Sequence, residues 1–179
     1  MYRLFAALEM PTHTHQRLCD TQSDLIGAKW RPAENFHITL QFFGDVSHQQ
    51  ARDLDDKLAK ILSHPLQLSI EGTGWFGRRA PRAVWARVRD DDGLRALASQ
   101  CEQVARRMGL PIDKHPYTPH VTLAYLHDTP LDDAQNWCKQ HHNLSISHIN
   151  FETFHLFSSH TGGGKPSRYI AEADYALGE

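Results

Sequence analysis

Apolar and polar residues alternate along several short stretches of the chain, and this alternation predicts β-strands. The clearest stretches run from Tyr2 to Glu9 and from His37 to Phe42, where apolar and β-branched residues dominate. Comparable stretches predict further strands at residues 66–70, 83–88, 147–157 and 169–176, and one beginning at residue 120. Residues 72–82 are rich in glycine, arginine and proline and are expected to form a loop between two strands.

Apolar residues spaced three and four positions apart predict helices between the strands. The clearest helix runs from Leu94 to Met108 and is ended by a glycine and a proline. Ser47 and Gln50 have the spacing of a capping box, which predicts a helix start after Ser47. Thr129 followed by Pro130 predicts another start, with the threonine as the capping residue. Strands and helices in this mixed order predict an α+β fold with helices outside the sheets.

One motif occurs twice in the predicted strands, as His37-Ile38-Thr39-Leu40 and as His120-Val121-Thr122-Leu123. Side chains alternate between the two faces of a strand, so each copy presents an imidazole and a hydroxyl on one face and apolar residues on the other. Each copy is followed by a predicted helix. We therefore expect residues 1–179 to form a single domain of two related halves, with one motif in each half.

Two imidazoles around one cavity predict acid–base chemistry. Free imidazole titrates near pH 6.5, so at neutral pH one histidine can be neutral while the other is protonated. His37 and His120 are the expected acid–base pair, although the symmetry of the motif does not assign the two roles. Thr39 and Thr122 lie one pleat away and are expected to donate to phosphate oxygens. This set of residues favours phosphodiester cleavage and needs no metal ion or cofactor.

Four other residues are candidates for binding RNA. Arg78 belongs to a small basic cluster near Trp85, and Tyr117 and Arg168 are a further aromatic residue and a further cation. Guanidinium groups bind phosphates, and aromatic rings stack on bases. A solvated hairpin with packed aromatic residues explains the cluster around Arg78 equally well.

The segment from 161 to 167 contains three glycines and a lysine, as a phosphate-binding loop does. The spacing is wrong because a proline follows Lys165, and strands rather than a helix are expected on both sides. A hairpin loop is therefore expected, from which Lys165 or Arg168 can reach a phosphate.

Composition narrows the class of protein further. The net charge of −2 argues against a large nonspecific nucleic-acid surface but leaves room for a local basic pocket. No apolar run reaches membrane-spanning length, and the first residues do not have the layout of a signal peptide. The three scattered cysteines have no metal-binding or redox spacing. We expect a cytoplasmic monomer with free thiols that binds no membrane.

The paired motifs resemble those of the 2H phosphoesterase superfamily. More narrowly, the chain is similar to the bacterial and archaeal RNA 2′,3′-cyclic phosphodiesterases, first described as tRNA 2′-5′ ligases. The resemblance spans the chain and includes Arg3–Leu8, Asn35-Phe36, Gly44–Val46, Ala83–Trp85, Pro119, Leu156–Ser159 and Tyr169.

The resemblance implies a bilobal fold, in which the single domain of residues 1–179 consists of two interleaved lobes with one motif in each. It also implies two pseudo-symmetric, antiparallel-rich sheets, helices on the outside and a central active-site groove. It also implies hydrolysis of a terminal 2′,3′-cyclic phosphate on RNA or a nucleotide to a 2′-phosphomonoester. In that reaction His37 is the proton donor to the departing 3′ oxygen, His120 is the acceptor that activates water, and Thr39 and Thr122 hold the phosphate.

The chain departs from the family at one position. Many relatives carry an arginine shortly after the second motif, where this chain has Ala124-Tyr125-Leu126. Lys114, Arg78 and Arg168 are the expected replacements for that cation.

Three other hypotheses remain open at this point. The first is a 2H phosphodiesterase, or a 2′-5′ RNA ligase, that acts on small or 2′-5′-linked nucleotides. The second is a non-catalytic module that binds RNA ends in the same groove. The third is a structural duplication in which the two histidines are buried and have no chemical role.

Overall fold

The computed structural model describes residues 1–160, 162 and 167–178. Most of the glycine-rich segment, with Lys165, therefore lies outside the described residues. The elements, in chain order, are β1 (Tyr2–Glu9), α1 (Thr12–Cys19), β2 (Ala28–Trp30), the 3-10 helix η1 (Ala33–Asn35), β3 (His37–Val46), α2 (His48–Leu58), β4 (Leu66–Phe76), β5 (Ala83–Val88), α3 (Asp92–Arg107), β6 (His120–Leu126), α4 (Leu131–Gln140), β7 (Ser145–Phe151), β8 (Thr153–His160) and β9 (Arg168–Ala176).

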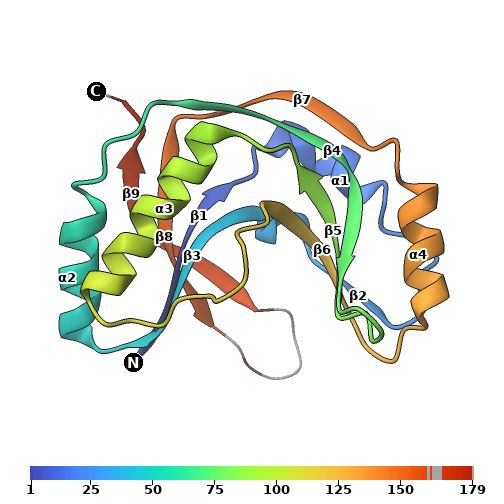
Figure 1. Ribbon diagram of the computed structural model, residues 1–179, viewed down its shortest axis with the longest axis horizontal. Helices are drawn as coiled ribbons and strands as arrows, with labels where there is room; N and C mark the ends of the chain where they lie inside the picture. The colour runs from blue at the N-terminus through green and yellow to red at the C-terminus, as the bar shows by residue number, and fades with distance from the viewer. Residues whose placement is uncertain (161, 163–166, 179) are drawn as a thin grey trace.

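The described strands form a sheet in the order β7-β4-β5-β6-β3-β1-β8-β9, with β2 paired to β6. Neighbouring strands run antiparallel. The two four-stranded halves meet between β3 and β6, where one register pair joins Ile38 to Val121. The α+β class is confirmed, and the two expected sheets are continuous through the strands that carry the motifs. Figure 1 shows the sheet curving into an arch.

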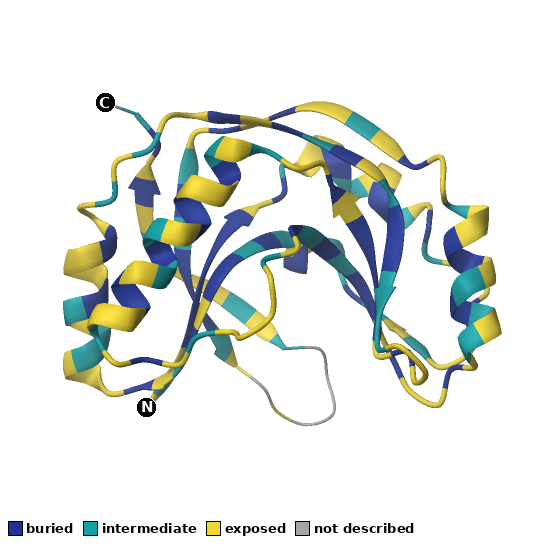
Figure 2. Cartoon of the chain, in the orientation of Figure 1, coloured by how far each residue is buried: buried dark blue, intermediate teal, exposed yellow. Residues whose placement is uncertain are grey.

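Helices cover the outer side of this arch, and the chain crosses between its halves to place them. Helix α3 follows β5 but packs on β3, whereas α1 follows β1 but packs on β7. Helix α2 lies beside α3, and α4 packs on β4 at the other end (Figure 1). Figure 2 shows buried stripes on the sides of the helices that face the sheet and exposed residues on their outer sides. The assignment of one domain with two lobes stays a prediction.

The predicted helix at 94–108 is confirmed with slightly earlier bounds. Its N-cap is Asp91, whose carboxylate accepts from the Leu94 amide at 2.8 Å. The residues that bury its apolar stripe are Leu94, Leu97, Ala98, Cys101, Val104 and Ala105. A contiguous apolar stripe of this kind supplies most of the driving force for a helix to dock on a sheet.

One of the two predicted helix caps is correct. Ser47 accepts from the Gln50 amide while the Gln50 side chain accepts from the Ser47 amide, so the capping box is present. The prediction for Thr129 was wrong, because Pro130 occupies the N-cap position of α4. The buried Thr129 hydroxyl instead donates to the Ile26 carbonyl at 2.8 Å. A buried hydroxyl needs a partner, and this carbonyl is the one within reach.

Two strand boundaries also differ from the prediction. Strand β4 continues to Phe76 through part of the expected loop, since an irregularity around Gly72, with φ of +78°, lets the strand resume pairing with β5. The stretch at 147–157 is divided at Glu152 into β7 and β8. Alternation of apolar residues does not reveal such breaks, because they depend on which strands become neighbours.

Candidate active site

The two motifs meet where β3 and β6 pair. Antiparallel strands pair residues in opposite order, so the Ile38–Val121 pair places His37 across from Thr122 and Thr39 across from His120. All four side chains are half-buried. Each imidazole therefore has a threonine beside it on its own strand and another on the neighbouring strand. The structure thus brings together the four residues that the repeat singled out.

Both motif strands carry an irregularity at the equivalent position. The pairing of β1 with β3 skips Leu40, and the pairing of β5 with β6 skips Leu123. After the skipped residue, Phe42 is 60% exposed and Tyr125 is 45% exposed. The burial patterns of the two strands match over seven residues. These bulges turn an aromatic side chain outward from each strand at the same distance from its histidine.

The backbone holds both imidazoles in the same tautomer. His37 Nδ1 lies 2.7 Å from the Asn35 carbonyl, and His120 Nδ1 lies 2.7 Å from the Thr118 carbonyl. A carbonyl oxygen only accepts, so Nδ1 is the donor in each ring. The proton-exchanging nitrogen of each neutral ring is therefore Nε2, as in other histidines oriented by a carbonyl.

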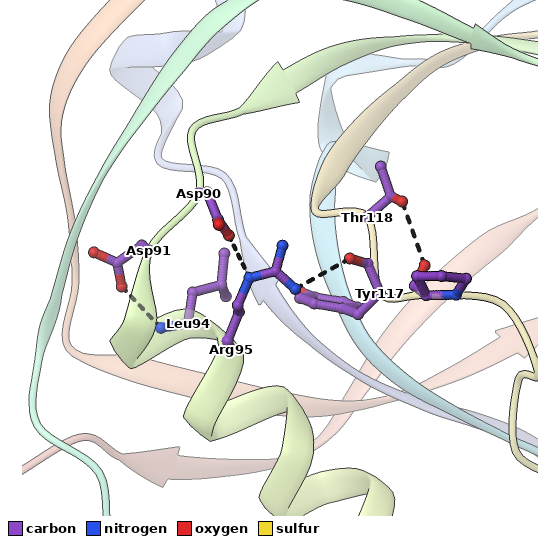
Figure 3. A network of polar contacts seen from close by, with 7 residues as sticks. Asp90, Asp91, Leu94, Arg95, Tyr117 and Thr118 are labelled. Atoms are coloured by element: carbon purple, nitrogen blue, oxygen red, sulfur yellow. Dashed lines mark hydrogen bonds and ion pairs between the residues drawn. The ribbon is translucent and has the colours of Figure 1, made fainter.

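A side chain of α3 and a backbone carbonyl of β3 hold the segment that precedes His120. Figure 3 shows Arg95, which pairs with Asp90, donating to the Tyr117 carbonyl, and Thr118 donating to the Pro116 carbonyl. The Tyr117 hydroxyl donates to the Thr39 carbonyl at 2.9 Å. The carbonyl that orients His120 is thus tied to the strand that carries the first motif.

Aromatic rings pack against both histidines. Phe5 and Tyr169 lie 5.0 and 5.2 Å from the His37 ring, measured between centroids. Phe76 and Trp85 lie 4.8 and 5.7 Å from the His120 ring. These contacts restrict the rotation of each imidazole and remove water from it.

Burial makes both imidazoles weak bases in the free protein. Burial lowers the pKa of His37 to about 4, with smaller contributions from His120 and from the positive charge of Arg31. Burial also lowers the pKa of His120. Both shifts favour the neutral imidazole in the free protein, against the expectation that one ring is protonated at neutral pH.

The rings of Trp85 and Tyr117 pack inside the fold next to the site and do not present free faces to a nucleic-acid base. Trp85 is only 6% exposed, and its ring is covered by Phe76 and His120. Tyr117 packs against the core and uses its hydroxyl on β3. The prediction that these two rings stack on RNA does not fit their burial.

The predicted cations are exposed residues outside the two motif strands. Arg78 is exposed between β4 and β5, and Lys114 is exposed between α3 and β6. Arg168 is exposed at the start of β9, across from His160. In the described part of the chain, none of the three forms a hydrogen bond or ion pair with a motif residue.

Sequence reasoning missed Arg31 and the position of Tyr169. Arg31 is 7% exposed, and its guanidinium donates to the Tyr169 hydroxyl at 3.1 Å. Tyr169 in turn packs edge-on against His37. The sequence carried no local signal for Arg31, because an arginine before a proline is ordinary in a loop.

Other features of the described residues bear on cofactors and membranes. Within residues 1–160, 162 and 167–178, no three histidine, cysteine or acidic side chains are arranged to hold a metal ion. The same part of the chain has no helix with the length and apolar character needed to cross a membrane. The three cysteines are free thiols, as their scatter predicted.

The paired His-x-Thr strands on a pseudo-symmetric sheet define a 2H phosphoesterase, the class that the motifs resembled. The chain matches the family described as the 2′-5′ RNA ligase superfamily over residues 12–163. It therefore belongs to that superfamily.

Curated relatives carry a consistent name. An Aeropyrum pernix protein named RNA 2′,3′-cyclic phosphodiesterase is 40% identical over 93 residues, which cover 51% of this chain and 53% of the relative. An Escherichia coli protein of the same name is 30% identical over 125 residues, or 68% of this chain and 70% of the relative. A Geobacillus stearothermophilus protein of that name is 34% identical over 108 residues, covering 59% of this chain but only 34% of the relative. The chain thus matches about a third to a half of the length of the first and third of these relatives.

Solved structures share the fold. Escherichia coli LigT complexed with 3′-AMP superposes with a TM-score of 0.80 at 24% identity, covering 99% of both chains. A Thermus thermophilus protein superposes with a TM-score of 0.78 at 23% identity, covering 98% of this chain and 97% of the other. At these identities the likeness supports the architecture alone.

Proposed function

We propose that the protein hydrolyses the terminal 2′,3′-cyclic phosphate of RNA to a 2′-phosphomonoester, with two histidines as acid and base and no metal ion. The observation that carries the proposal is the crossed arrangement of the motifs, in which His37 faces Thr122 and His120 faces Thr39. Relatives named RNA 2′,3′-cyclic phosphodiesterase support the choice of substrate.

In the proposed reaction, Nε2 of His120 takes a proton from a water molecule as its oxygen bonds to phosphorus. The bond between phosphorus and the ribose 3′ oxygen breaks, and Nε2–H of His37 donates a proton to that oxygen. The products are a 2′-phosphomonoester and a free 3′ hydroxyl. Thr39 and Thr122 donate to the non-bridging oxygens, where negative charge develops.

The phosphate of the substrate is part of the proposed mechanism because its negative charge raises the pKa of His37, the proposed acid. An anion beside His37 favours the imidazolium and opposes the burial that lowers its pKa in the free protein. His37 is therefore charged when substrate is bound and neutral otherwise. This coupling keeps the buried His37 ring uncharged until the phosphate binds.

These pKa shifts predict an acidic optimum for kcat/KM. The reactive free form needs one protonated and one neutral imidazole, while the pKa of His37 is about 4 and that of His120 lies below its usual 6.5. We expect a bell-shaped pH profile of kcat/KM whose two apparent pKa values both lie below 6.5. Above pH 6.5, kcat/KM is then expected to fall about tenfold per pH unit. The optimum of kcat is expected at a higher pH than the optimum of kcat/KM, because bound phosphate raises the pKa of the acid, His37. A kcat/KM that stays level from pH 6.5 to 9 contradicts this account.

The proposed activity is tested with an RNA oligonucleotide that ends in a 2′,3′-cyclic phosphate, incubated with the full chain in EDTA. Matched substrates are the same RNA with a 3′ hydroxyl and a 2′-5′-linked dinucleotide. We expect conversion of the cyclic end alone, at a rate that EDTA leaves unchanged. Loss of activity in EDTA that a divalent metal restores contradicts the metal-free mechanism.

Other outcomes select the alternatives. Cleavage of the 2′-5′ dinucleotide without conversion of the cyclic end favours a phosphodiesterase for 2′-5′ linkages. Tight binding of the cyclic end with no turnover between pH 5 and 8 favours a module that binds RNA ends.

A further inference from the structure

Arg31 is held by its backbone next to the second motif strand. Its amide donates to the Leu123 carbonyl at 2.8 Å, which extends the pairing of β2 with β6 by one residue. Its carbonyl accepts from the Gln22 side chain at 2.8 Å. The residue is 7% exposed, so the guanidinium has little freedom to move into solvent.

The guanidinium lies close to two aromatic rings that border the site. Its central carbon is 5.3 Å from the centroid of the Tyr125 ring and 5.5 Å from that of the Tyr169 ring. It also donates to the Tyr169 hydroxyl at 3.1 Å, and the Tyr169 ring contacts His37. Arg31 is thus connected to the first catalytic candidate through one side chain.

This buried cation lacks a carboxylate partner in the part of the chain that the structure describes. Glu9 and Glu34 line the small cavity beside His37 and Tyr169, but neither lies within the 4.0 Å of an ion pair with Arg31. Burying a charge without a counterion is unfavourable, and proteins rarely do so outside binding sites.

The Arg31 guanidinium also has N–H donors that no described residue accepts from. Among the described residues, Trp85 Nε1 is the buried side-chain nitrogen or oxygen that has no hydrogen-bond partner. Nε and Nη1 of Arg31 have no side-chain or backbone partner among the same residues. The positive charge acts on His37 as well, since it contributes to lowering that pKa.

We propose that Arg31 is the cation that binds the anionic phosphate held between His37 and His120. This inference rests on the proposed function for the identity of the ligand. A guanidinium with free donors binds phosphate oxygens in a fork geometry that lysine does not offer. Arg31, rather than Lys114, Arg78 or Arg168, then supplies the positive charge of the site.

The first test measures binding, so it does not depend on turnover. The ligands are an RNA ending in a 2′-phosphate and the same RNA ending in hydroxyls, titrated into wild type and Arg31→Gln by calorimetry. We expect Arg31→Gln to weaken binding of the phosphorylated RNA roughly 10- to 100-fold and binding of the hydroxyl RNA less than threefold. Arg89→Gln, which removes an exposed arginine paired with Glu71, is the control for net charge and is expected to change neither.

Charge relocation provides a second test. Because the Tyr125 ring lies over the guanidinium, Arg31→Gln/Tyr125→Arg returns a guanidinium to the same space from the neighbouring strand. We expect this double variant to recover at least half of the lost binding, on a logarithmic scale. Equal weakening of both RNAs by Arg31→Gln, or unchanged binding of the phosphorylated RNA, overturns the proposal.

A measurement on wild type covers the case in which Arg31→Gln does not fold. Inorganic phosphate is added while the side-chain Nε–Hε signals of the arginines are followed by NMR, with Arg31→Lys used for assignment. We expect the Arg31 signal to shift in a saturable way, and a signal that does not respond contradicts the proposal. Phosphate binding by Arg31 in a protein that does not convert cyclic ends would refute the proposed function and leave this inference standing.

Discussion

Replacing His37 or His120 with alanine is expected to lower the rate of cyclic-phosphate hydrolysis about 10²- to 10⁴-fold. In the proposed mechanism each ring supplies one of the two proton transfers, and its Nε2 is oriented by a backbone carbonyl that the other ring cannot use. The effect is expected mainly in kcat, since the threonines and Arg31, the groups proposed to bind the phosphate, remain in these variants. The measurement is the steady-state rate on RNA ending in a 2′,3′-cyclic phosphate.

His127→Ala is the matched control for these two variants. His127 follows β6 directly and is exposed, so its removal is expected to leave the rate within twofold of wild type. Thermal unfolding separates the remaining hypotheses. If the histidines were only packed structural residues, both alanine variants would lose stability and the rate per folded molecule would not change.

Replacing Thr39 or Thr122 with valine is expected to lower kcat about 10²-fold for each threonine. Valine has nearly the same shape and favours strands, so the substitution removes a hydroxyl donor while the fold is kept. In the crossed arrangement each hydroxyl lies beside both imidazoles, where the phosphate oxygens are expected. The measurement is kcat at saturating cyclic-phosphate RNA.

Serine variants at the same two positions test whether the hydroxyl is responsible. Thr39→Ser and Thr122→Ser keep the donor and are expected to retain at least a tenth of the wild-type kcat. A valine variant that changes kcat less than threefold would remove that threonine from the proposed mechanism. A serine variant as slow as its valine counterpart would point to packing instead.

The central pair of the site could be predicted from the sequence because it depends on local rules. Alternation along a strand places His37 and Thr39 on one face, and the second copy repeats this with His120 and Thr122. Buried apolar stripes and the Ser47 capping box depend on spacing within one element, and they were predicted correctly.

The errors concern features that depend on distant neighbours. Trp85 was expected to face RNA because arginines lie near it in the sequence, but Phe76 and His120 cover its ring in the fold. Arg31 has no local pattern, and its significance comes from Tyr125 and Tyr169, which lie far away along the chain. The pKa values of the histidines likewise follow from burial, which the motif itself does not determine.

The bulges after the motifs are a further feature that the sequence did not reveal. Leu40 and Leu123 look like ordinary alternating strand residues, yet each is skipped in the pairing with its neighbour. The skip turns Phe42 and Tyr125 toward solvent. Whether a strand bulges depends on the register of the adjacent strand, so pairing had to be known first.

The most direct test of the central claim is the position of the product phosphate and its dependence on the two histidines. Cyclic-phosphate RNA is hydrolysed in ¹⁸O-water with EDTA by wild type, His37→Ala and His120→Ala, and the products are identified by mass spectrometry and ³¹P NMR. The account predicts a 2′-phosphate that contains one ¹⁸O atom and a free 3′ hydroxyl, formed rapidly by wild type only. A 3′-phosphate product, or undiminished conversion by both variants, would contradict it.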